Sequence, residues 1–542
     1  MPTLQFKGKS FVQNHHLAVK FHQLVPVKGK SLTEKVSLHD NLIVQGDNLK
    51  ALKALLPTYA GKVKCIYIDP PYNTGTEHWV YNDNVNSPMM QEWLADNAPV
   101  DKDDLCRHDK WLCMMMPRLK LLKELLSEDG ILLFSIDDNE IHAARYLLNE
   151  ILGEHNYLNT IHWKARGSGG QVKDGAIASQ FQYIIIHAKD KTRSTLNKFD
   201  NENAGLDNWR DYRKSGGLWQ KKYRLNQHFP FYYSEKHNLL SLSKTSKSDE
   251  VEILPKAQNG IEGYWENYPA TAKDRLDAKE LKPKRDKKGE WKIMQYEVGE
   301  EDVNVGNYVD LPSTRAMSEM KDLGIGFETP KPVELIEHIL SLASNEDDII
   351  LDSFAGSGTT AHAVLNLNKA GGHRRFILVE MEDYADSMTA ERVRRVIKGV
   401  PTSANYQEGI GGSFSYFKLG DPIEMEQILH GKSLPSYEDL ARYVFYTATG
   451  EQFDAADISK DKKKPFIGTS KEYPGGVYLY YEPNMPYLMG TALSLDMAKA
   501  LGPHKNKKRL VFAPMKYLDQ DYLDQLRIDY SQLPFEIYRF KE

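Results

Sequence analysis

The residues best suited to chemistry follow a short apolar run at positions 66–68 and begin with Asp69. Pro70, Pro71 and Tyr72 come directly after it. The apolar run predicts a buried strand, so Asp69 is expected at the end of that strand. Proline has no backbone N–H, but its carbonyl still accepts a hydrogen bond. The group therefore offers a carboxylate and a fixed carbonyl beside an aromatic ring, which suits a planar guest that carries an NH₂ group.

Two acceptors on one amino group can also activate it. The lone pair of an aromatic amine is delocalised, and hydrogen bonds to Asp69 and to the Pro70 carbonyl favour a pyramidal nitrogen with a localised lone pair. Such a nitrogen can attack a sulfonium methyl group that is held in line with it. Asp69 would stabilise the positive charge that develops on nitrogen, and orientation would supply much of the remaining rate. The plainer alternative is that Asp69 only caps a turn.

A second group, the glycine turn Asp352-Ser-Phe-Ala-Gly-Ser-Gly358, joins a predicted strand to a predicted helix. Glycines at such a turn let backbone N–H groups approach a ligand closely. Glu380 ends the next predicted strand, 22 positions after Gly358, where a carboxylate can hold ribose hydroxyls. This pattern indicates an adenosine-type cofactor. Because residues 356–361 also satisfy G-x-G-x-x-A, an NAD-binding site stays open, as does a tight turn without a ligand.

The elements that position both groups follow a βαβ pattern. Strands are predicted at 41–47, 62–69 and 181–190, helices at 48–59 and 333–343, and a strand–helix–strand unit at 348–380. Such alternation implies a parallel sheet with right-handed crossovers. We therefore predict an α/β protein with a doubly wound, Rossmann-like sheet, in which ligands bind beyond the carboxyl ends of the strands.

The length of 542 residues is too great for one hydrophobic core. The net charge of −5 argues against a chain that binds nucleic acid over its whole surface. The spacing of the three cysteines, Cys65, Cys106 and Cys113, is typical neither of a metal site nor of a disulfide. We therefore expect no bound metal, and we expect the protein to reside in a reducing cytoplasm. No signal peptide or membrane-spanning stretch is recognised, and no membrane partner is predicted.

The segment from Arg210 to Lys292 differs from the rest of the chain. It holds 19 Lys and Arg residues against 12 Asp and Glu residues, and aromatic residues are interleaved with them. A separate module or large insertion is predicted here. Its basic side chains can contact phosphates while a few others read base edges. The densest run, KPKRDKKGEWK at 282–292, is also compatible with a solvated hairpin.

These motifs together resemble the S-adenosylmethionine-dependent DNA amino-methyltransferases of the beta order. In that order the catalytic motif precedes the target-recognition region, which precedes the cofactor motif. Here DPPYNTG (69–75) is followed by the basic and aromatic segment, then by FETPKP (327–332) and LDSFAGSGTT (351–360). The resemblance covers about residues 40–195 and 325–395. It is greatest to modification subunits of type III restriction systems and to related solitary adenine methyltransferases.

The resemblance implies a permuted methyltransferase fold with an inserted recognition module and an extra C-terminal α/β domain. The expected parts are an N-terminal extension (1–40), a catalytic half (41–195), a target-recognition region (196–320), a cofactor-binding half (321–404) and a C-terminal domain for dimer or partner contacts (405–542).

The resemblance also assigns site residues by position. The catalytic residues are Asp69, Pro70, Pro71 and Tyr72, and those near S-adenosylmethionine are Asp47, Thr329, Lys331, Pro332, Asp352, Phe354, Gly356, Gly358, Thr359 and Glu380. Tyr72, with Phe181 or Tyr183, is the expected stacking partner of an extruded base. For Asp47, Phe181 and Tyr183, a helix cap or a core aromatic is the competing interpretation.

Aspartate at position 69 resembles the adenine-N6 members, whereas serine is commoner among the cytosine-N4 members. The expected activity is therefore adenine-N6 methylation of a base flipped out of double-stranded DNA, within a restriction-modification or related system. The expected setting is the prokaryotic cytoplasm, at the nucleoid. A homodimer and a helicase-nuclease restriction partner are implied as well. The alternatives are an N4-cytosine methyltransferase, an NAD-dependent oxidoreductase, and a noncatalytic subunit that reads DNA for a partner.

Overall fold

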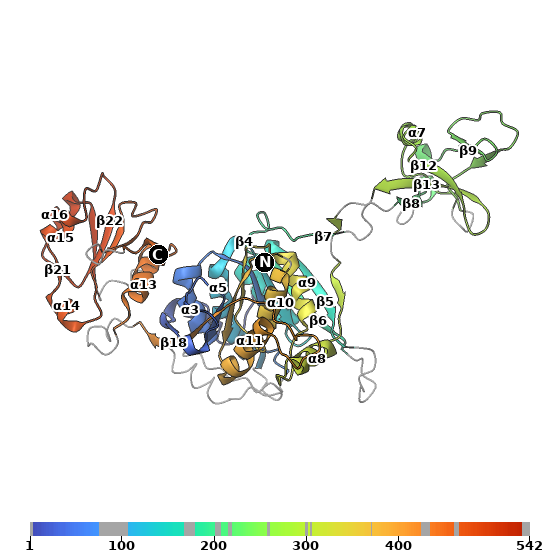
Figure 1. The fold of residues 1–542 in the computed structure, drawn as a ribbon. Helices are drawn as coiled ribbons and strands as arrows, with labels where there is room; N and C mark the ends of the chain where they lie inside the picture. Colours follow the sequence, from blue (N-terminus) through green and yellow to red (C-terminus); the bar gives the residue numbers. More distant parts are fainter. Residues whose placement is uncertain are drawn as a thin grey trace. The chain divides into compact units, whose positions relative to one another are not determined.

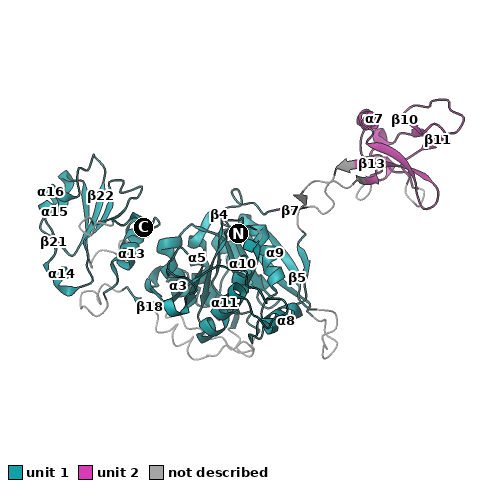
Figure 2. Ribbon diagram, viewed as in Figure 1, with its two compact units in different colours: residues 1–197, 306–542 teal, residues 198–305 magenta. Residues whose placement is uncertain are grey.

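The computed structural model divides the chain into two compact units, one of residues 1–197 with 306–542 and one of residues 198–305 (Figure 2). The residues that the structure describes are 4–74, 107–166, 179–200, 207–214, 219–256, 261–298, 302–303, 306–369, 371–423, 434–459 and 465–533.

A ten-stranded sheet forms the centre of the larger unit, in the order β1-β18-β2-β17-β16-β3-β4-β6-β5-β15. From one edge to the other the strands are β1 (His22–Pro26), β18 (Ser415–Pro422), β2 (Leu42–Gln45), β17 (Arg375–Glu380), β16 (Ile349–Asp352), β3 (Val63–Ile68), β4 (Leu126–Ile136), β6 (Phe181–Ala188), β5 (Tyr157–Lys164) and β15 (Tyr308–Asp310). The five middle strands from β2 to β4 run parallel to one another.

The chain order of the middle strands produces a switch point. β2 and β3 follow each other in the sequence, but β17 and β16 lie between them in the sheet. Ile350 of β16 is therefore paired with Cys65 of β3. The strand before the glycine turn and the strand before Asp69 are immediate neighbours, although almost 300 residues separate them in the sequence. This arrangement confirms the predicted doubly wound sheet and its permuted order.

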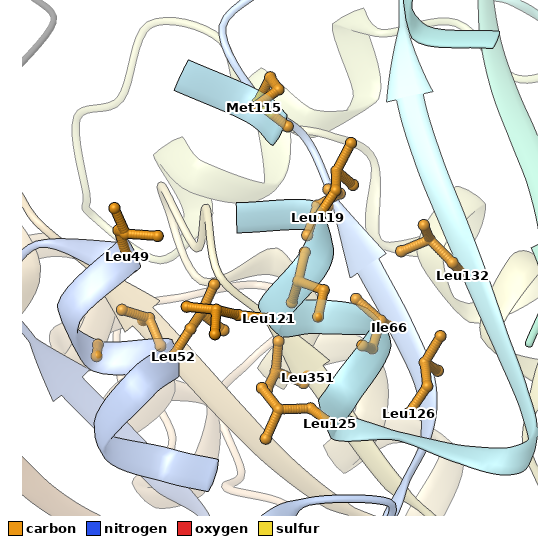
Figure 3. Packing of buried hydrophobic residues seen from close by; sticks show 14 of the residues in the cluster. Leu49, Leu52, Ile66, Met115, Leu119, Leu121, Leu125, Leu126, Leu132 and Leu351 are labelled. Atoms are coloured by element: carbon orange, nitrogen blue, oxygen red, sulfur yellow. The ribbon is translucent and has the colours of Figure 1, made fainter. Parts of the chain in front are cut away.

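Helices cover both faces of this sheet (Figure 1). In one helix layer α5 (Arg107–Leu125) packs against α3 (Asn48–Tyr59) and α6 (Ile141–Leu152). In the other layer α10 (Thr359–Lys369) packs against α9 (Val333–Ala343) and α11 (Glu391–Lys398). Leu52 of α3, Leu121 of α5 and Ile66 of β3 belong to one fully buried cluster (Figure 3). A buried Leu, Ile or Val contributes about 1.5–3 kcal/mol, so this packing fixes the strands whose ends carry the site.

The sheet extends past two of the predicted boundaries. β1 pairs antiparallel with β18, and β18 pairs in parallel with β2. Residues 22–26 and 415–422 are therefore part of the central sheet, whereas boundaries at 40 and 404 would exclude them. The apolar alternation of β1 and β18 is weak in the sequence, because the burial of their residues is uneven. The short helices α1 (Lys9–Val12) and α2 (His15–Ala18) precede β1.

The smaller unit, Lys198–Val305, is shorter at its end than the predicted region 196–320. The difference arises because β15 pairs with β5 of the central sheet, and α8 (Thr314–Asp322) follows it. Among the described residues of the smaller unit, α7 (Pro269–Asp277) is an α-helix. The strands there are β7 (Phe199–Asp200), β8 (Asp207–Asp211), β9 (Phe231–Ser234), β10 (Leu239–Ser241), β11 (Glu250–Ile253), β12 (Leu281–Arg285), β13 (Trp291–Val298) and β14 (Asp302–Val303).

An aromatic core holds the smaller unit together. Tyr212 stacks on Trp265 with ring centroids 5.6 Å apart, and Phe231 meets Trp265 edge-on at 5.4 Å. All three side chains are buried. Many of the interleaved aromatic residues of this segment thus build a small core, and the basic residues lie around it.

The segment after β18 forms a second, smaller sheet with helices of its own. It contains a four-stranded sheet in the order β19 (Phe466–Gly468), β20 (Val477–Leu479), β22 (Arg509–Ala513) and β24 (Ile528–Gln532), with the short pair β21 (Ala492–Leu493) and β23 (Met515–Lys516). Its helices are α13 (Tyr437–Thr449), α14 (Met485–Gly490), α15 (Leu495–Ala500) and α16 (Gln520–Gln525). In the part of the chain that the structure describes, no helix combines the length and the apolar character needed to cross a bilayer.

Candidate active site

The two predicted groups meet at the carboxyl edge of the sheet. β3 ends at Ile68, so Asp69 is the first residue beyond the strand, and β16 ends next to it at Asp352. β17, on the other side of β16, ends at Glu380. Three carboxylates thus terminate three adjacent parallel strands. This edge, at a switch point, is where α/β sheets bind ligands.

Both carboxylate oxygens of Asp69 already accept hydrogen bonds. The Tyr72 hydroxyl donates to Oδ1 at 2.7 Å, and the Lys331 ammonium donates to Oδ2. A carboxylate has about four acceptor positions, so Asp69 can accept further hydrogen bonds. Its side chain is 22% exposed, which leaves it accessible at the edge of the sheet.

The Tyr72 ring is held by its hydroxyl group. Ser135 of β4 lies 2.8 Å from this hydroxyl, and the Gln182 side chain of β6 accepts from it at 3.3 Å. Burial and the nearby Asp69 raise the pKa of Tyr72 well above its usual value, so the phenol stays neutral. The Lys331 ammonium lies 4.9 Å from the ring centroid. A base that stacks on Tyr72 must use the other ring face or displace that ammonium.

The glycine turn is built by side chains that bind its backbone. Asp352 accepts hydrogen bonds from the Phe354 N–H at 3.0 Å and from the Thr360 hydroxyl at 2.6 Å. Gly356 and Gly358 have φ values of 51° and 78°, which L side chains rarely adopt. A Cβ atom at Gly358 would lie 3.0 Å from the Thr389 carbonyl oxygen. Asp352 therefore shapes the turn, and the glycines keep its backbone open.

Glu380 holds the other side of this turn. One of its oxygens accepts from the Gly356 N–H at 2.7 Å, and the other accepts from the Glu382 N–H at 3.0 Å. Burial raises the pKa of Glu380 to about 7 and that of Asp352 to about 7. Each Glu380 oxygen still has a second lone pair, which can accept from a ribose hydroxyl. The ionised form of Glu380 is therefore suited to hold the ribose of a nucleoside ligand.

Residues 329–332 connect the two groups. Lys331 reaches Asp69 with its side chain, while its carbonyl accepts from the Thr359 hydroxyl at 3.4 Å. Pro332 precedes α9 as its N-cap residue, and Thr329 is exposed. The predicted methionine-end segment therefore lies between the Asp69 group and the start of α10.

Three of the predicted site residues have structural partners elsewhere. Asp47 caps α3 by accepting from the Lys50 N–H at 3.0 Å, as the competing interpretation held. Tyr183 donates to Asp138 at 2.7 Å, and Phe181 meets Tyr308 edge-on. Side chains alternate along a strand, so both rings point away from the sheet face that carries Gln182. The stacking role of Phe181 or Tyr183 stays a prediction.

Sequence reasoning missed several residues that touch the site. Arg392 of α11 is fully buried and donates to the hydroxyls of Ser357 at 3.0 Å and Thr359 at 2.8 Å. It is also 3.6 Å from Glu319 of α8. No local pattern marks an arginine on an amphipathic helix as a buried support. For Gln182, the usable signal in the sequence was the alternation of side chains along β6, which places Gln182 on the opposite face from Phe181 and Tyr183.

The fold and the site together define a class of enzyme. A doubly wound sheet with an adenosine-type turn, next to an acceptor-rich group for an amine, is the arrangement of a methyltransferase with a nucleoside cofactor. The left-handed glycines and the unfilled lone pairs of Glu380 fit S-adenosylmethionine.

Comparison with known proteins identifies the family. The model for the DNA methylase family, which comprises N6 and N4 methyltransferases, matches residues 63–391. The chain belongs to this family and is a site-specific DNA methyltransferase that uses S-adenosylmethionine. Membership of the family sets aside the NAD-dependent alternative.

Curated relatives cover most of the chain. The Mod subunit of the type III restriction-modification enzyme EcoPI, from Escherichia phage P1, is 29% identical over 84% of this chain and 76% of its own length. The EcoP15I Mod subunit of Escherichia coli is 31% identical over 70% of this chain and 64% of its own length. The type II methyltransferase M.KpnI of Klebsiella pneumoniae is 30% identical over 62% of this chain and 79% of its own length.

Proposed function

We propose that this enzyme methylates the N6 amine of adenine in double-stranded DNA, at the site formed by Asp69, Tyr72 and the glycine turn. The observation that carries the proposal is the position of Asp69, which ends the strand directly beside the strand that leads to the cofactor turn. Aspartate at this position, and similarity to Mod subunits, favour adenine. Cytosine-N4 methylation is the alternative within the same family.

The residues of this chain divide the work as follows. The cofactor would be held by Gly356, Gly358, Thr359 and Glu380, with Phe354, Asp352, Lys331, Thr329, Pro332 and Asp47 around them. Bound S-adenosylmethionine supplies an electrophilic methyl group. Asp69 accepts a hydrogen bond from the target amine, with the Pro70 carbonyl as second acceptor, and stabilises the charge that develops on nitrogen. The surplus amine proton then leaves to solvent, because the methylated cation is acidic.

Lys331 has a defined part in this scheme. Its ammonium occupies Oδ2 of Asp69 and one side of the Tyr72 ring. Entry of a base on that side requires the ammonium to move, and the carboxylate oxygen it leaves becomes available to the amine. Tyr72 then stacks on the base while its hydroxyl stays anchored to Ser135.

The proposal is tested by replacing Asp69. The Asp69→Ala variant is expected to transfer no labelled methyl group to mixed-sequence DNA, while its affinity for S-adenosylmethionine stays within about threefold, because its side chain bonds Tyr72 and Lys331 and not the glycine turn. Turnover like that of the wild type would overturn the mechanism.

The base is identified separately. The protein is expressed in a host that lacks DNA methylation, and modified bases are mapped by single-molecule sequencing. N6-methyladenine at one short recognition sequence is expected. N4-methylcytosine would replace adenine by cytosine as the target, and unmodified DNA would support a noncatalytic DNA-reading subunit.

We further propose that the smaller unit reads the DNA and that the target base flips out of the duplex, since its amine is otherwise inaccessible. The proposal also includes a homodimer and a helicase-nuclease restriction partner. It places the enzyme at the nucleoid in the bacterial cytoplasm. Similarity to Mod subunits over most of the chain supports these parts of the proposal. Sedimentation of the purified protein tests the dimer, and capture of a helicase-nuclease subunit by the tagged protein in its native host tests the partner.

A further inference from the structure

The loop that follows β3 is held on both sides of Tyr72 by residues outside the mechanism above. Before Tyr72, the indole N–H of Trp111 donates to the Pro71 carbonyl at 2.7 Å. After Tyr72, the side-chain amide of Asn73 donates to Oε1 of Glu140 at 2.5 Å. Trp111 and Asn73 are fully buried, and Glu140 is 1% exposed. The two contacts come from α5 and from the start of α6.

Asn73 has a backbone conformation that needs support. Its φ is 58°, in the left-handed region. Asparagine visits this region more readily than most residues, but the conformation persists only where the surroundings determine it. The hydrogen bond to Glu140 stabilises this conformation, because it fixes the direction of the Asn73 side chain inside the protein.

The Glu140 side chain bonds the loop although it could instead have capped α6. It is the N-cap residue of α6, yet its side chain makes no capping hydrogen bond to that helix. The carboxylate turns toward the loop instead, where Nδ1 of His108 also lies 2.5 Å from Oε1. His108 is in the first turn of α5, the helix that carries Trp111. One carboxylate oxygen thus joins α5, α6 and the loop.

We propose that Glu140 and Trp111 are positioning residues for methyl transfer, which set the direction of the Asp69 carboxylate and the Tyr72 ring by holding Asn73 and Pro71. This inference rests on the proposed assignment of the Asp69 loop as the transfer site. Neither residue is expected to contact the cofactor, because the turn that binds it is built from Asp352, Glu380 and Arg392.

A reciprocal exchange of donor and acceptor tests the contact between Asn73 and Glu140. Asn73→Asp places a second carboxylate against Glu140 and is expected to slow single-turnover methyl transfer by tenfold or more, with affinity for S-adenosylmethionine within twofold. Glu140→Gln keeps an acceptor oxygen for the Asn73 amide, so its transfer rate is expected to stay within about threefold of wild type. In the double variant the new amide nitrogen at position 140 donates one hydrogen to the new carboxylate at position 73 and the other to Nδ1 of a neutral His108. Recovery of most of the lost rate is expected.

Trp111→Phe tests the second contact, because it removes the indole N–H and keeps an aromatic ring at this buried position. It is expected to lower the same rate several-fold without changing cofactor affinity. Asp129→Asn is the matched control. Asp129 pairs with Lys64 at 2.6 Å near the opposite ends of β3 and β4, so its loss perturbs the same strands away from the loop and leaves the transfer rate unchanged.

Three results would overturn the inference. They are a transfer rate within twofold of wild type in Asn73→Asp, a double variant that is no faster than Asn73→Asp, and an equal loss of rate in Asp129→Asn. The Asp69→Ala variant separates this inference from the proposed function. If that variant is active, the site itself is misassigned; if it is inactive while Asn73→Asp is fully active, only the positioning role fails.

Discussion

At the scale of single residues, the site is a set of carboxylates with different tasks. Asp69 bonds Tyr72 and Lys331, which surround the target base in the proposed mechanism. Asp352 bonds the backbone and a hydroxyl inside the glycine turn, and Glu380 has lone pairs left to accept from a ligand. All three end neighbouring strands. Their roles differ because their hydrogen-bond partners differ, and not because of their position in the sheet.

The raised pKa of Glu380 predicts how cofactor binding depends on pH. Its pKa is about 7, and the ionised form is the better acceptor for two ribose hydroxyls. Affinity for S-adenosylmethionine should therefore fall as the pH drops from 8 to 6, by up to about tenfold per unit below the pKa. Glu380→Gln should bind about 10- to 100-fold more weakly and lose most of this dependence. Calorimetric titration at several pH values measures both effects.

The raised pKa of Glu380 also predicts how stability depends on pH. The predicted slope of unfolding free energy against pH has the opposite sign to that expected for a salt-bridged acid. The folded state binds the Glu380 proton more tightly than the unfolded state does, so the free energy of unfolding falls as the pH rises from about 4 to 7 and is flat above that range. Glu380→Gln should show a shallower fall, with the share of Asp352 retained. An unchanged slope in urea unfolding would contradict this.

At the scale of elements, the two loops of the site depend on contacts from the helices and strands around them. The glycine turn is held from α10 by Thr360, from α11 by Arg392 and from β17 by Glu380. The loop after β3 is held in the same manner from α5 and α6. Rigid elements thus present short irregular segments, and the cost of those irregular backbones is met by contacts from neighbouring elements.

A methyl group added at Gly358 should damage the turn. Gly358→Ala forces a left-handed alanine and brings Cβ to 3.0 Å from the Thr389 carbonyl oxygen. A stability loss of about 1–3 kcal/mol is expected, together with a large loss of cofactor affinity. Gly450→Ala is the control, because Gly450 has a φ of 67° but open space around its Cβ position. It should lose stability without losing affinity, as thermal unfolding with and without cofactor will measure.

The sequence predicted those parts of the site that local patterns encode. Asp69 and Glu380 were found because apolar runs end at them, and the glycine turn because its residue types demand an unusual backbone. Gln182, Trp111 and Arg392 were not found, since their role depends on packing between elements that are distant in the sequence. β1 and β18 were missed for a similar reason: they pair with each other at the edge of the sheet although almost 400 residues separate them in the sequence.

At the scale of the molecule, the smaller unit carries a sheet face that suits DNA phosphates. Lys284 of β12 lies directly opposite Lys292 of β13, and Lys282 shares their face and lies 3.7 Å from the centroid of the Trp209 ring. Like charges directly opposite each other destabilise a sheet. Asp211 of β8 offsets part of this repulsion, because it lies 3.9 Å from the Lys292 ammonium. Lys282 and Lys284 are exposed cations of this face that a polyanion would contact, while α7 and the aromatic core occupy the other face.

Lys284→Ala should therefore weaken DNA binding about 3- to 10-fold and reduce the slope of log affinity against log salt by about one. The effect should be similar for all sequences, since phosphate contacts carry no base information. Lys273→Ala is the matched control, because Lys273 is exposed on α7, which packs on the opposite face of this sheet. Equal loss in both variants would show that only net charge matters.

The junctions of the inserted unit have a consequence for how such enzymes diversify. Before the insertion, Asn197 donates from its backbone to Leu342 and from its side chain to Ser341, and after it the Asn307 carbonyl accepts from the His162 N–H. Both ends are thus fastened within the catalytic unit, independently of what lies between them. If residues 198–305 read the DNA as proposed, recombination that replaces them with a foreign segment is expected to keep these attachments and to produce a new recognition sequence in one genetic event rather than by gradual mutation.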